Sequence, residues 1–318
     1  MHVTIVTHYR LPVVGYGGTE RIVSALARGL AARGHRVTLL ARPGSELPAV
    51  HRVVALPDDA FRAPAEALRQ FVPDDTDVVH AHFPVAAPPP GAPFLQTLYG
   101  NLGAGDELPP HTVCLSRNHA NRHGTDAWVY CGLDPAEFTF RRDKDDYDLF
   151  IGRLHSIKGY RWAIAGAKQT RQRLLIAGGW RPSFSRYVRY VGEVDGARKR
   201  ELLAGARCVW MPALWDEPFG LTLIEPLLSG TPVLGTRRGS LPEILTAEVG
   251  ALCDTQEEMI AASRTIASRS PDACRAHAER FFSHLAMADA YVGVYRHLIA
   301  TGQLPAGRPT PWAPHTTS

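Results

Sequence analysis

The sequence predicts an α/β protein built from two doubly wound parallel sheets, each in a domain of its own. Short apolar runs alternate with amphipathic helical segments, which is the pattern of βαβ units. A glycine-rich loop between a strand and a helix occurs once in each half, at residues 15–18 and again at 152–159. The length of 318 residues also suffices for two ordinary domains.

The first half opens with a βαβ unit. Val3–Thr7 is expected to be a buried strand, Thr19–Arg33 a helix with one apolar face, and Val37–Ala41 a second strand. Further strands are expected at 50–56, 77–81, 94–98, 113–116 and 128–131, with a helix at 117–123. The charged segment Phe138–Asp148 is expected to link the domains.

The second half repeats the pattern. Strands are expected at 147–151, 173–177, 208–211, 231–236 and 250–253, and helices at 160–169, 198–206, from about 220, 256–268, 272–281 and 283–299. The tail 303–318 is rich in proline and threonine and is expected to be disordered.

Composition excludes several classes of protein. Hydrophobic residues make up 45% and charged residues 21%, an ordinary soluble balance. The net charge of +4 is compatible with an anionic substrate but too weak to argue for nucleic acid. Five cysteines without ligand spacing predict reduced thiols and a cytoplasmic location. The first residues are expected to form a strand rather than a signal peptide. No apolar run in the sequence is long enough to span a bilayer, so membrane contact is expected to be peripheral at most.

The stretch 214–243 carries the strongest functional motif. Glu217 lies in the loop before a predicted helix, and Glu225 lies at least one turn inside that helix. A ligand at the helix N-terminus meets free N–H groups around Phe219, Gly220 and Leu221, which suits a diphosphate. Each carboxylate can then accept hydrogen bonds from hydroxyls on either side, one from a sugar and one from a ribose.

This stretch resembles the signature of a known enzyme family. The string Glu-Pro-Phe-Gly-Leu-x-x-x-Glu, followed by Gly-Thr-Pro-Val and Arg-Gly-Ser-x-Pro-Glu, resembles that of the retaining glycosyltransferases of family four. These enzymes have the GT-B fold, in which two Rossmann-like domains face a cleft. Pro226 inside the predicted helix is a departure, because proline lacks the N–H of the helical ladder.

The loop after the strand at 147–151 supports the same resemblance. Gly-Arg-Leu-x-x-x-Lys-Gly matches the phosphate-binding loop of the family at both basic positions, Arg153 and Lys158. Arginine can bind a diphosphate bidentately, and lysine acts as a mobile point charge. The resemblance implies that Glu217 contacts the donor sugar, that Glu225 holds the ribose, and that the loop with Val191 and Glu193 packs near the base.

The resemblance also assigns the glycine loop of the first half. Gly17 and Gly18 belong to a Gly-Tyr-Gly-Gly-Thr-Glu string that looks like the family loop facing the donor phosphates. A dinucleotide-binding Rossmann loop is the alternative, but the third glycine is missing. The second strand also ends in Arg42 rather than in an acidic residue.

Polar residues at the ends of two expected strands are candidates for the acceptor side. His80 and His82 end a predicted strand, where open α/β sheets bind ligands, although His80 is equally well explained as a packing residue. Tyr99, next to Gly100 and Asn101, stands where family members commonly have a histidine near the anomeric carbon. Tyrosine donates a hydrogen bond but does not titrate near neutrality.

Other activities also fit parts of this pattern. A glycoside hydrolase also uses two carboxylates but needs no diphosphate loop. A metal-dependent transferase would use Asp-x-Asp, but Asp75–Asp77 and Asp146–Asp148 precede predicted strands, away from the ligand-binding end of a sheet. A non-catalytic GT-B protein that binds a nucleotide sugar is favoured by Tyr99, and a GT-B sugar epimerase is a further alternative.

The sequence therefore predicts a retaining, metal-independent glycosyltransferase that uses a nucleoside diphosphate sugar and an unknown acceptor, with no cofactor, no metal ligands and no nucleic acid. Residues 1–142 are expected to form the acceptor-side domain, with helix 283–300 packing back on it, and 143–282 the donor-binding domain. The expected catalytic residues are Glu217, Arg153, Lys158 and Tyr99. We also expect Lys158→Ala and Glu225→Ala each to weaken nucleoside diphosphate binding markedly while leaving the melting temperature nearly unchanged.

Overall fold

The computed structural model describes residues 1–13, 17–61, 66–85 and 91–306. The chain divides into two compact units, which we call unit 1 (Met1–Asp134, continued from Ser283) and unit 2 (Pro135–Phe282). The division falls at Asp134 rather than at residue 142, because the intervening residues pack on unit 2. Arg142 pairs with Asp272, for example, and Arg275 donates to the Pro135 carbonyl.

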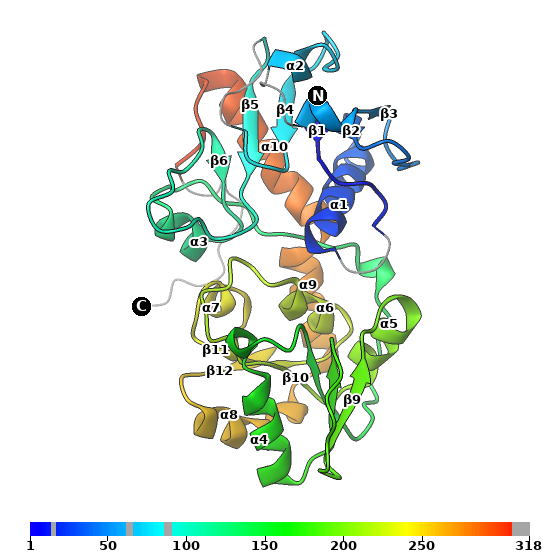
Figure 1. Ribbon diagram of the computed structural model, residues 1–318, viewed down its shortest axis with the longest axis vertical. Helices are drawn as coiled ribbons and strands as arrows, with labels where there is room; N and C mark the ends of the chain where they lie inside the picture. The colour runs from blue at the N-terminus through cyan, green and yellow to red at the C-terminus, as the bar shows by residue number, and fades with distance from the viewer. Residues whose placement is uncertain (14–16, 62–65, 86–90, 307–318) are drawn as a thin grey trace. The chain divides into compact units, whose positions relative to one another are not determined.

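Unit 1 is a six-stranded parallel sheet in the order β3-β2-β1-β4-β5-β6, the order of a doubly wound fold (Figure 1). Its elements are β1 (His2–Val6), α1 (Gly18–Ala32), β2 (Arg36–Ala41), β3 (Arg52–Ala55), η1 (Asp58–Phe61), α2 (Glu66–Arg69), β4 (Val78–Ala81), β5 (Phe94–Thr97), β6 (Thr112–Val113), α3 (Arg117–Arg122) and α10 (His284–Thr301).

The last helix of the chain belongs to unit 1. Helix α10 packs along α1, and the approach is close at Gly29, where an added Cβ would lie 2.5 Å from the His284 carbonyl oxygen. Arg33 of α1 forms an ion pair with Asp289 of α10 at 2.6 Å. The contact places Tyr291 and Tyr295 of α10 beneath the sheet, where they meet polar side chains of β4 and β5.

Unit 2 repeats the same topology, in the order β12-β11-β10-β7-β8-β9. Its elements are η2 (Pro135–Glu137), β7 (Asp148–Ile151), η3 (Ser156–Lys158), α4 (Tyr160–Thr170), β8 (Leu174–Ala177), β9 (Val188–Gly192), α5 (Gly196–Gly205), β10 (Val209–Met211), α6 (Leu221–Leu228), β11 (Val233–Thr236), α7 (Leu241–Ile244), β12 (Gly250–Cys253), α8 (Gln256–Ser263), η4 (Ile266–Ser268) and α9 (Pro271–Phe282).

The core of unit 2 is built around Trp210 of β10, which is 1% exposed. Gly166 lets α4 lie against the indole, since a Cβ there would be 2.3 Å from the ring. The indole N–H donates to the Asp148 carboxylate at 3.0 Å, so its one polar atom is satisfied. Burial raises the pKa of Asp148.

The predicted fold class is confirmed, and most predicted elements are present within a few residues of their expected bounds. The strand expected at 128–131 is wrong, because only a single bridge joins Trp128 to Cys114. Residues 190–192, expected in a loop, belong to the edge strand β9, and the helix expected at 256–268 ends at Ser263. The expectations for Gly15 and for most of the tail, from residue 307, lie outside the described residues. Among the described helices, none is both long and apolar enough to cross a membrane.

Candidate functional site

The loop after β7 carries Lys158 and is anchored to the segment that follows β10. Gly159 has φ +66°, and a Cβ at this position would lie 1.9 Å from the Pro212 carbonyl oxygen. The Leu214 N–H donates to the Ile157 carbonyl at 2.7 Å. Only glycine permits this contact, which brings two strand-end loops of the sheet together.

The result is a pairing of Lys158 with Glu217. The ammonium donates to Oε2 of Glu217 at 2.6 Å, and the Trp215 indole N–H donates to the same oxygen at 3.0 Å. The ammonium also lies 4.8 Å from the centre of the Trp215 ring. The side chains of Lys158 and Glu217 are 26% and 12% exposed, so both remain accessible to a ligand.

A second glycine fixes the backbone of Glu217. Gly239, in the loop after β11, has φ +56°, and its Cβ would lie 2.4 Å from the Glu217 nitrogen. Ser240 binds the same segment at two points, through its N–H to the Glu217 carbonyl at 3.0 Å and its hydroxyl to the Phe219 carbonyl at 2.6 Å. The Asp216 carboxylate accepts the Gly239 N–H at 3.2 Å. The loop before α6 is therefore held in place by the loop that follows β11.

Helix α6 begins where the sequence predicted, and it carries the second carboxylate. Gly220, its N-cap, has φ +85°, a left-handed conformation that suits glycine. Glu225 is 1% exposed, and the ammonium of Lys199 in α5 donates to its Oε1 at 2.7 Å. Pro226 lies inside the helix without ending it before Leu228.

The other residues predicted to bind the donor differ in how accessible their side chains are. Arg153 and Glu193 are exposed, and Val191 and Leu221 are partly buried. Phe219 is 2% exposed and its ring packs 5.9 Å from that of Phe282, so its side chain belongs to the core and only its backbone can serve a ligand.

Gly17 and Gly18 lie at the start of α1 in unit 1. Gly17 is the N-cap, and a Cβ there would lie 2.7 Å from the Glu20 carboxylate. An acidic side chain therefore already occupies the positive end of this helix.

The histidines of unit 1 form a buried polar cluster with tyrosines. His80 is fully paired, to Tyr295 and to Thr97, each at 2.7 Å, and it is completely buried. His82 pairs through Nδ1 with the Tyr99 hydroxyl at 2.7 Å. These contacts explain His80 as a packing residue. Tyr99 is only partly buried, and its hydroxyl contacts the buried His82. Asn101, the third residue expected on this side, is partly buried two positions beyond Tyr99.

Burial sets the protonation of this cluster. It lowers the pKa of His82 to about 3 and holds the pKa of His80 well below its usual range. Burial also raises the pKa of Tyr99 well above the usual value. The histidines are therefore neutral imidazoles and Tyr99 a neutral phenol at neutral pH.

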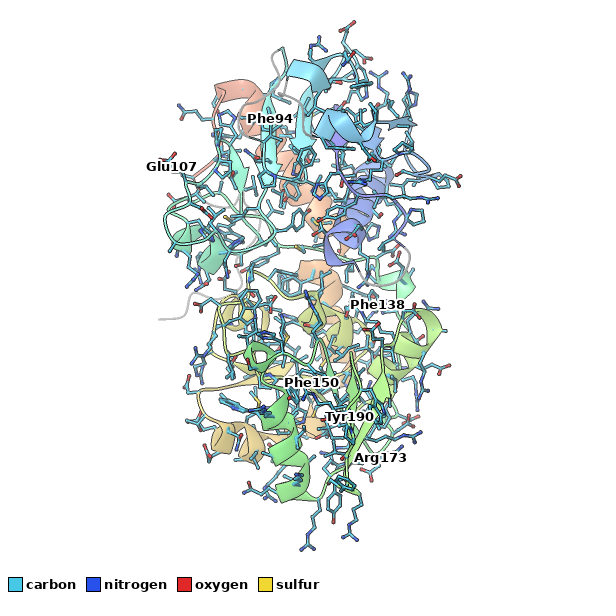
Figure 2. The ribbon with its side chains drawn as sticks, in the orientation of Figure 1. Phe94, Glu107, Phe138, Phe150, Arg173 and Tyr190 are labelled. Atoms are coloured by element: carbon cyan, nitrogen blue, oxygen red, sulfur yellow. The ribbon has the colours of Figure 1, made fainter. Side chains whose placement is uncertain are left out.

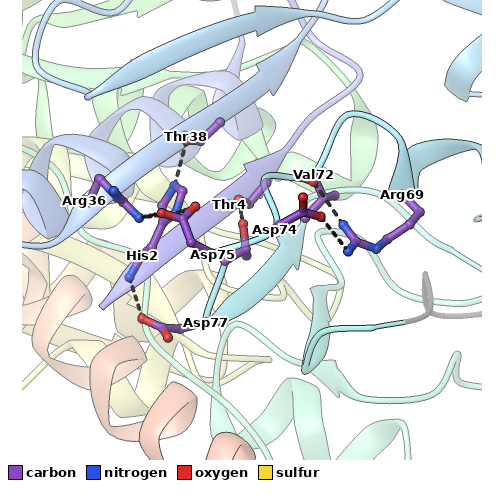
Figure 3. A network of polar contacts seen from close by, with 10 residues as sticks. His2, Thr4, Arg36, Thr38, Arg69, Val72, Asp74, Asp75 and Asp77 are labelled. Atoms are coloured by element: carbon purple, nitrogen blue, oxygen red, sulfur yellow. Dashed lines mark hydrogen bonds and ion pairs between the residues drawn. The ribbon is translucent and has the colours of Figure 1, made fainter.

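The two Asp-x-Asp pairs have structural partners. Figure 3 shows Asp75 bound by His2 and Arg36, and Asp77 accepting the His2 N–H at 2.7 Å. In the second pair, Asp148 accepts the Trp210 indole and Asp146 accepts Gln172 at 2.8 Å. Across the described parts of the chain, no group of three or more histidine, cysteine or acidic residues could hold a metal ion.

Comparison with known proteins identifies the family. The family model described as Glycosyl transferases group 1 matches residues 147–268, and the model described as Glycosyltransferase Family 4 matches residues 16–134. One match falls in each unit. The chain belongs to the family-four glycosyltransferases.

Individual relatives of this glycosyltransferase agree with the family. The crystal structure of AviGT4, a glycosyltransferase involved in avilamycin A biosynthesis, is 29% identical with a TM-score of 0.76, over 94% of this chain and 98% of that one. The glycogen synthase of Mycobacterium tuberculosis is 26% identical in an alignment of 392 positions, which covers 92% of this chain and 94% of the synthase. A GDP-mannose-dependent phosphatidylinositol dimannoside mannosyltransferase of the same organism is 46% identical over 69 residues, 21% of this chain and 18% of its own. The two doubly wound sheets are those of the GT-B fold.

Sequence reasoning missed several residues that shape the site of this glycosyltransferase. Lys199 and Trp215 contact the two glutamates directly, and Gly239 and Ser240 hold the backbone between them. Gly239 and Ser240 belong to the Arg-Gly-Ser-x-Pro-Glu string, but the sequence alone assigned them no role. Nothing in the spacing of Lys199 indicated its partner.

Proposed function

We propose that this glycosyltransferase transfers a sugar from a nucleoside diphosphate sugar to an acceptor hydroxyl, with retention of anomeric configuration and without a metal. The observation that carries the proposal is the Lys158–Glu217 pair beside the N-terminus of α6. A cation, a carboxylate and a helix N-terminus in one place suit a phosphorylated sugar. The mycobacterial relative, a GDP-mannose-dependent mannosyltransferase, supports a donor of this class.

In this proposal the donor binds along unit 2. Arg153, Lys158 and the first amides of α6 hold the diphosphate, and Glu217 accepts from hydroxyls of the sugar. The ion pair with Glu217 already holds the Lys158 side chain in position. An incoming phosphate can therefore bind the ammonium without the entropy cost of ordering a free side chain. Glu225 holds the ribose, and Val191 and Glu193 lie near the base.

The proposed reaction breaks the bond between the anomeric carbon and the diphosphate oxygen. The bonding pair leaves with the phosphate, and Lys158 and Arg153 stabilise the charge that develops there. One such donor is typically worth about 3–4 kcal/mol in the transition state. The acceptor oxygen then bonds to the same face of the anomeric carbon, and its proton passes to the leaving phosphate oxygen. Retention follows from this front-face route, which needs no protein base, so a neutral Tyr99 suffices on the acceptor side.

The cellular setting forms part of the proposal. All five cysteines are buried free thiols, which supports a reducing compartment, and we propose the cytoplasm. The acceptor is a hydroxyl compound rather than a nucleic acid, for which the net charge of +4 offers little attraction.

The donor site is tested with a thermal-shift and calorimetry panel of UDP, GDP, ADP and dTDP. One of them is expected to bind, and Lys158→Ala to weaken it by at least roughly tenfold, or about 1.4 kcal/mol. Lys168→Ala is the matched control, since this exposed lysine of α4 makes no contact with Glu217. Equal affinity in both variants would remove Lys158 from the donor site.

The chemistry is tested separately, by release of nucleoside diphosphate from the matching sugar donor in the presence of EDTA. Undiminished turnover is expected, and the released sugar should show the anomeric configuration of the donor by NMR. Recovery of activity only on adding Mg²⁺ or Mn²⁺ would contradict the proposed mechanism.

A further inference from the structure

One continuous part of unit 2 carries only positive charge. Between Asp148 and Glu193 there is no acidic residue, and nine of the chain's 35 lysines and arginines fall in this stretch: Arg153, Lys158, Arg161, Lys168, Arg171, Arg173, Arg181, Arg186 and Arg189. The donor site uses the first two. The others have no role in the proposed transfer.

The same stretch contains an unusual connection between parallel strands. Strands β8 and β9 are parallel, and such a crossover normally contains a helix that covers the sheet. Here residues 178–187 make the crossover without a helix, as a strap. The strap exposes two large aromatic side chains, Trp180 at 70% and Phe184 completely. Exposed aromatic groups of this size are uncommon on a surface that has no partner.

The strap and α4 together form one surface. Arg161 and Lys168 lie on the face of α4 beside the strap, and Arg181 of the strap lies over the ring of Tyr160, as Arg161 does. Within the described chain, none of Arg161, Lys168, Arg181 and Arg186 forms an ion pair with a carboxylate. These charges are therefore available to an external anion.

A groove lies between the strap, α4 and β9. It has a volume of about 430 Å³, and its walls include Ile164, Val188 and Tyr190 beside Phe184. Figure 2 labels Tyr190 in this part of unit 2. The walls combine aliphatic, aromatic and polar side chains, and their apolar part can accept hydrocarbon chains.

We propose that the strap and the adjoining face of α4 bind the surface of an anionic lipid bilayer. Trp180 and Phe184 enter the interface, where aromatic rings are favoured, while the arginines and Lys168 contact lipid phosphates. This surface acts independently of the donor site and places the enzyme at a membrane without a spanning helix.

The test is flotation of the full chain with vesicles of phosphatidylcholine, with and without one-third phosphatidylglycerol. Binding is expected only with the anionic lipid and is expected to weaken with added salt. Trp180→Ser with Phe184→Ser should weaken binding at least tenfold. Arg181→Gln and Arg186→Gln should each weaken it about fivefold, or about 1 kcal/mol per charge.

Two control variants lie outside this surface. Ile299→Ser removes an exposed apolar side chain from α10, and Arg200→Gln removes an exposed charge from α5. Both should bind vesicles as the wild type does, and all variants should keep nucleoside diphosphate affinity and melting temperature. Absence of vesicle binding, equal binding to neutral vesicles, or equal loss in the control variants would overturn the proposal. So would loss of nucleotide affinity on changing Trp180, or binding of single-stranded nucleic acid in place of vesicles.

Discussion

Lys199→Met is expected to lower both the stability of unit 2 and its affinity for a nucleoside diphosphate. Lys199 donates to Oε1 of Glu225 at 2.7 Å, and this carboxylate is 1% exposed. Methionine keeps the length of the side chain but removes the charge. The carboxylate then stays buried without the ammonium that stabilises its charge.

The size of the effect follows from the burial of the two partners. Removing one member of a fully buried ion pair costs about 3–5 kcal/mol, whereas an exposed pair contributes about 0–1 kcal/mol. Lys199 is 22% exposed, so water screens one side of the pair and we expect about 2 kcal/mol. For a unit of this size that corresponds to about 4–8 °C in melting temperature.

The assay is urea unfolding and thermal melting of Lys199→Met, Glu225→Gln and the double variant. The double variant should lose less free energy of unfolding than the two single variants lose together, because the neutral amide that replaces the Glu225 carboxylate needs no cation. Arg198→Met is the matched control, since Arg198 lies on the same helix and its partner Glu201 is 3.9 Å away on the surface. A melting temperature for Lys199→Met equal to that of Arg198→Met would refute the reasoning. Calorimetry with the bound nucleotide should show weaker binding for Lys199→Met and unchanged binding for Arg198→Met.

Two further predictions concern the backbone and pH. Gly239→Ala should destabilise unit 2 by about 2 kcal/mol and weaken donor binding, because its methyl group meets the Glu217 backbone and φ is +56°. Gly196 has φ +46° and open space around it, so Gly196→Ala should lower the free energy of unfolding by only about 1 kcal/mol and leave donor binding intact. Equal losses for the two variants in urea unfolding would count against the contact between Gly239 and the Glu217 backbone. Since the folded-state pKa of His82 is lowered to about 3, the unfolded chain binds the proton first as pH falls below 6.5. The contribution of the buried neutral His82 to the free energy of unfolding is complete above pH 6.5. Below that pH it declines by up to about 1.4 kcal/mol per pH unit. His82→Gln should reduce the pH dependence of the urea midpoint between pH 6.5 and about 5.5, and an unchanged dependence would show that the imidazole is not buried in its neutral form.

The elements of unit 2 could be predicted because their signals are local. The loop with Lys158 and the stretch with Glu217 each follow a buried strand, and parallel strands end at the same edge of a sheet. Lys158 and Glu217 therefore lie together, with 2.6 Å between the ammonium and Oε2. The roles of both residues in catalysis stay predictions.

The partners of the two glutamates could not be predicted, because they depend on how helices pack. Lys199 meets Glu225 only because α5 lies beside α6. From the sequence alone, Glu225→Ala is expected to leave the melting temperature nearly unchanged. The contact with Lys199 predicts a loss of stability instead, because a buried carboxylate with its own cation is paired in the folded state.

In unit 1, the contacts that decide the chemistry join residues far apart in sequence. His80 is paired by Tyr295, 215 positions away, which no local pattern indicates. That pairing leaves His82 and Tyr99 as the polar pair at the end of the sheet. With the pKa of His82 lowered and that of Tyr99 raised, no proton moves between them near neutral pH. The pair can orient a hydroxyl by hydrogen bonding but cannot deprotonate it, and for this reason the proposed mechanism transfers the acceptor proton to the departing phosphate.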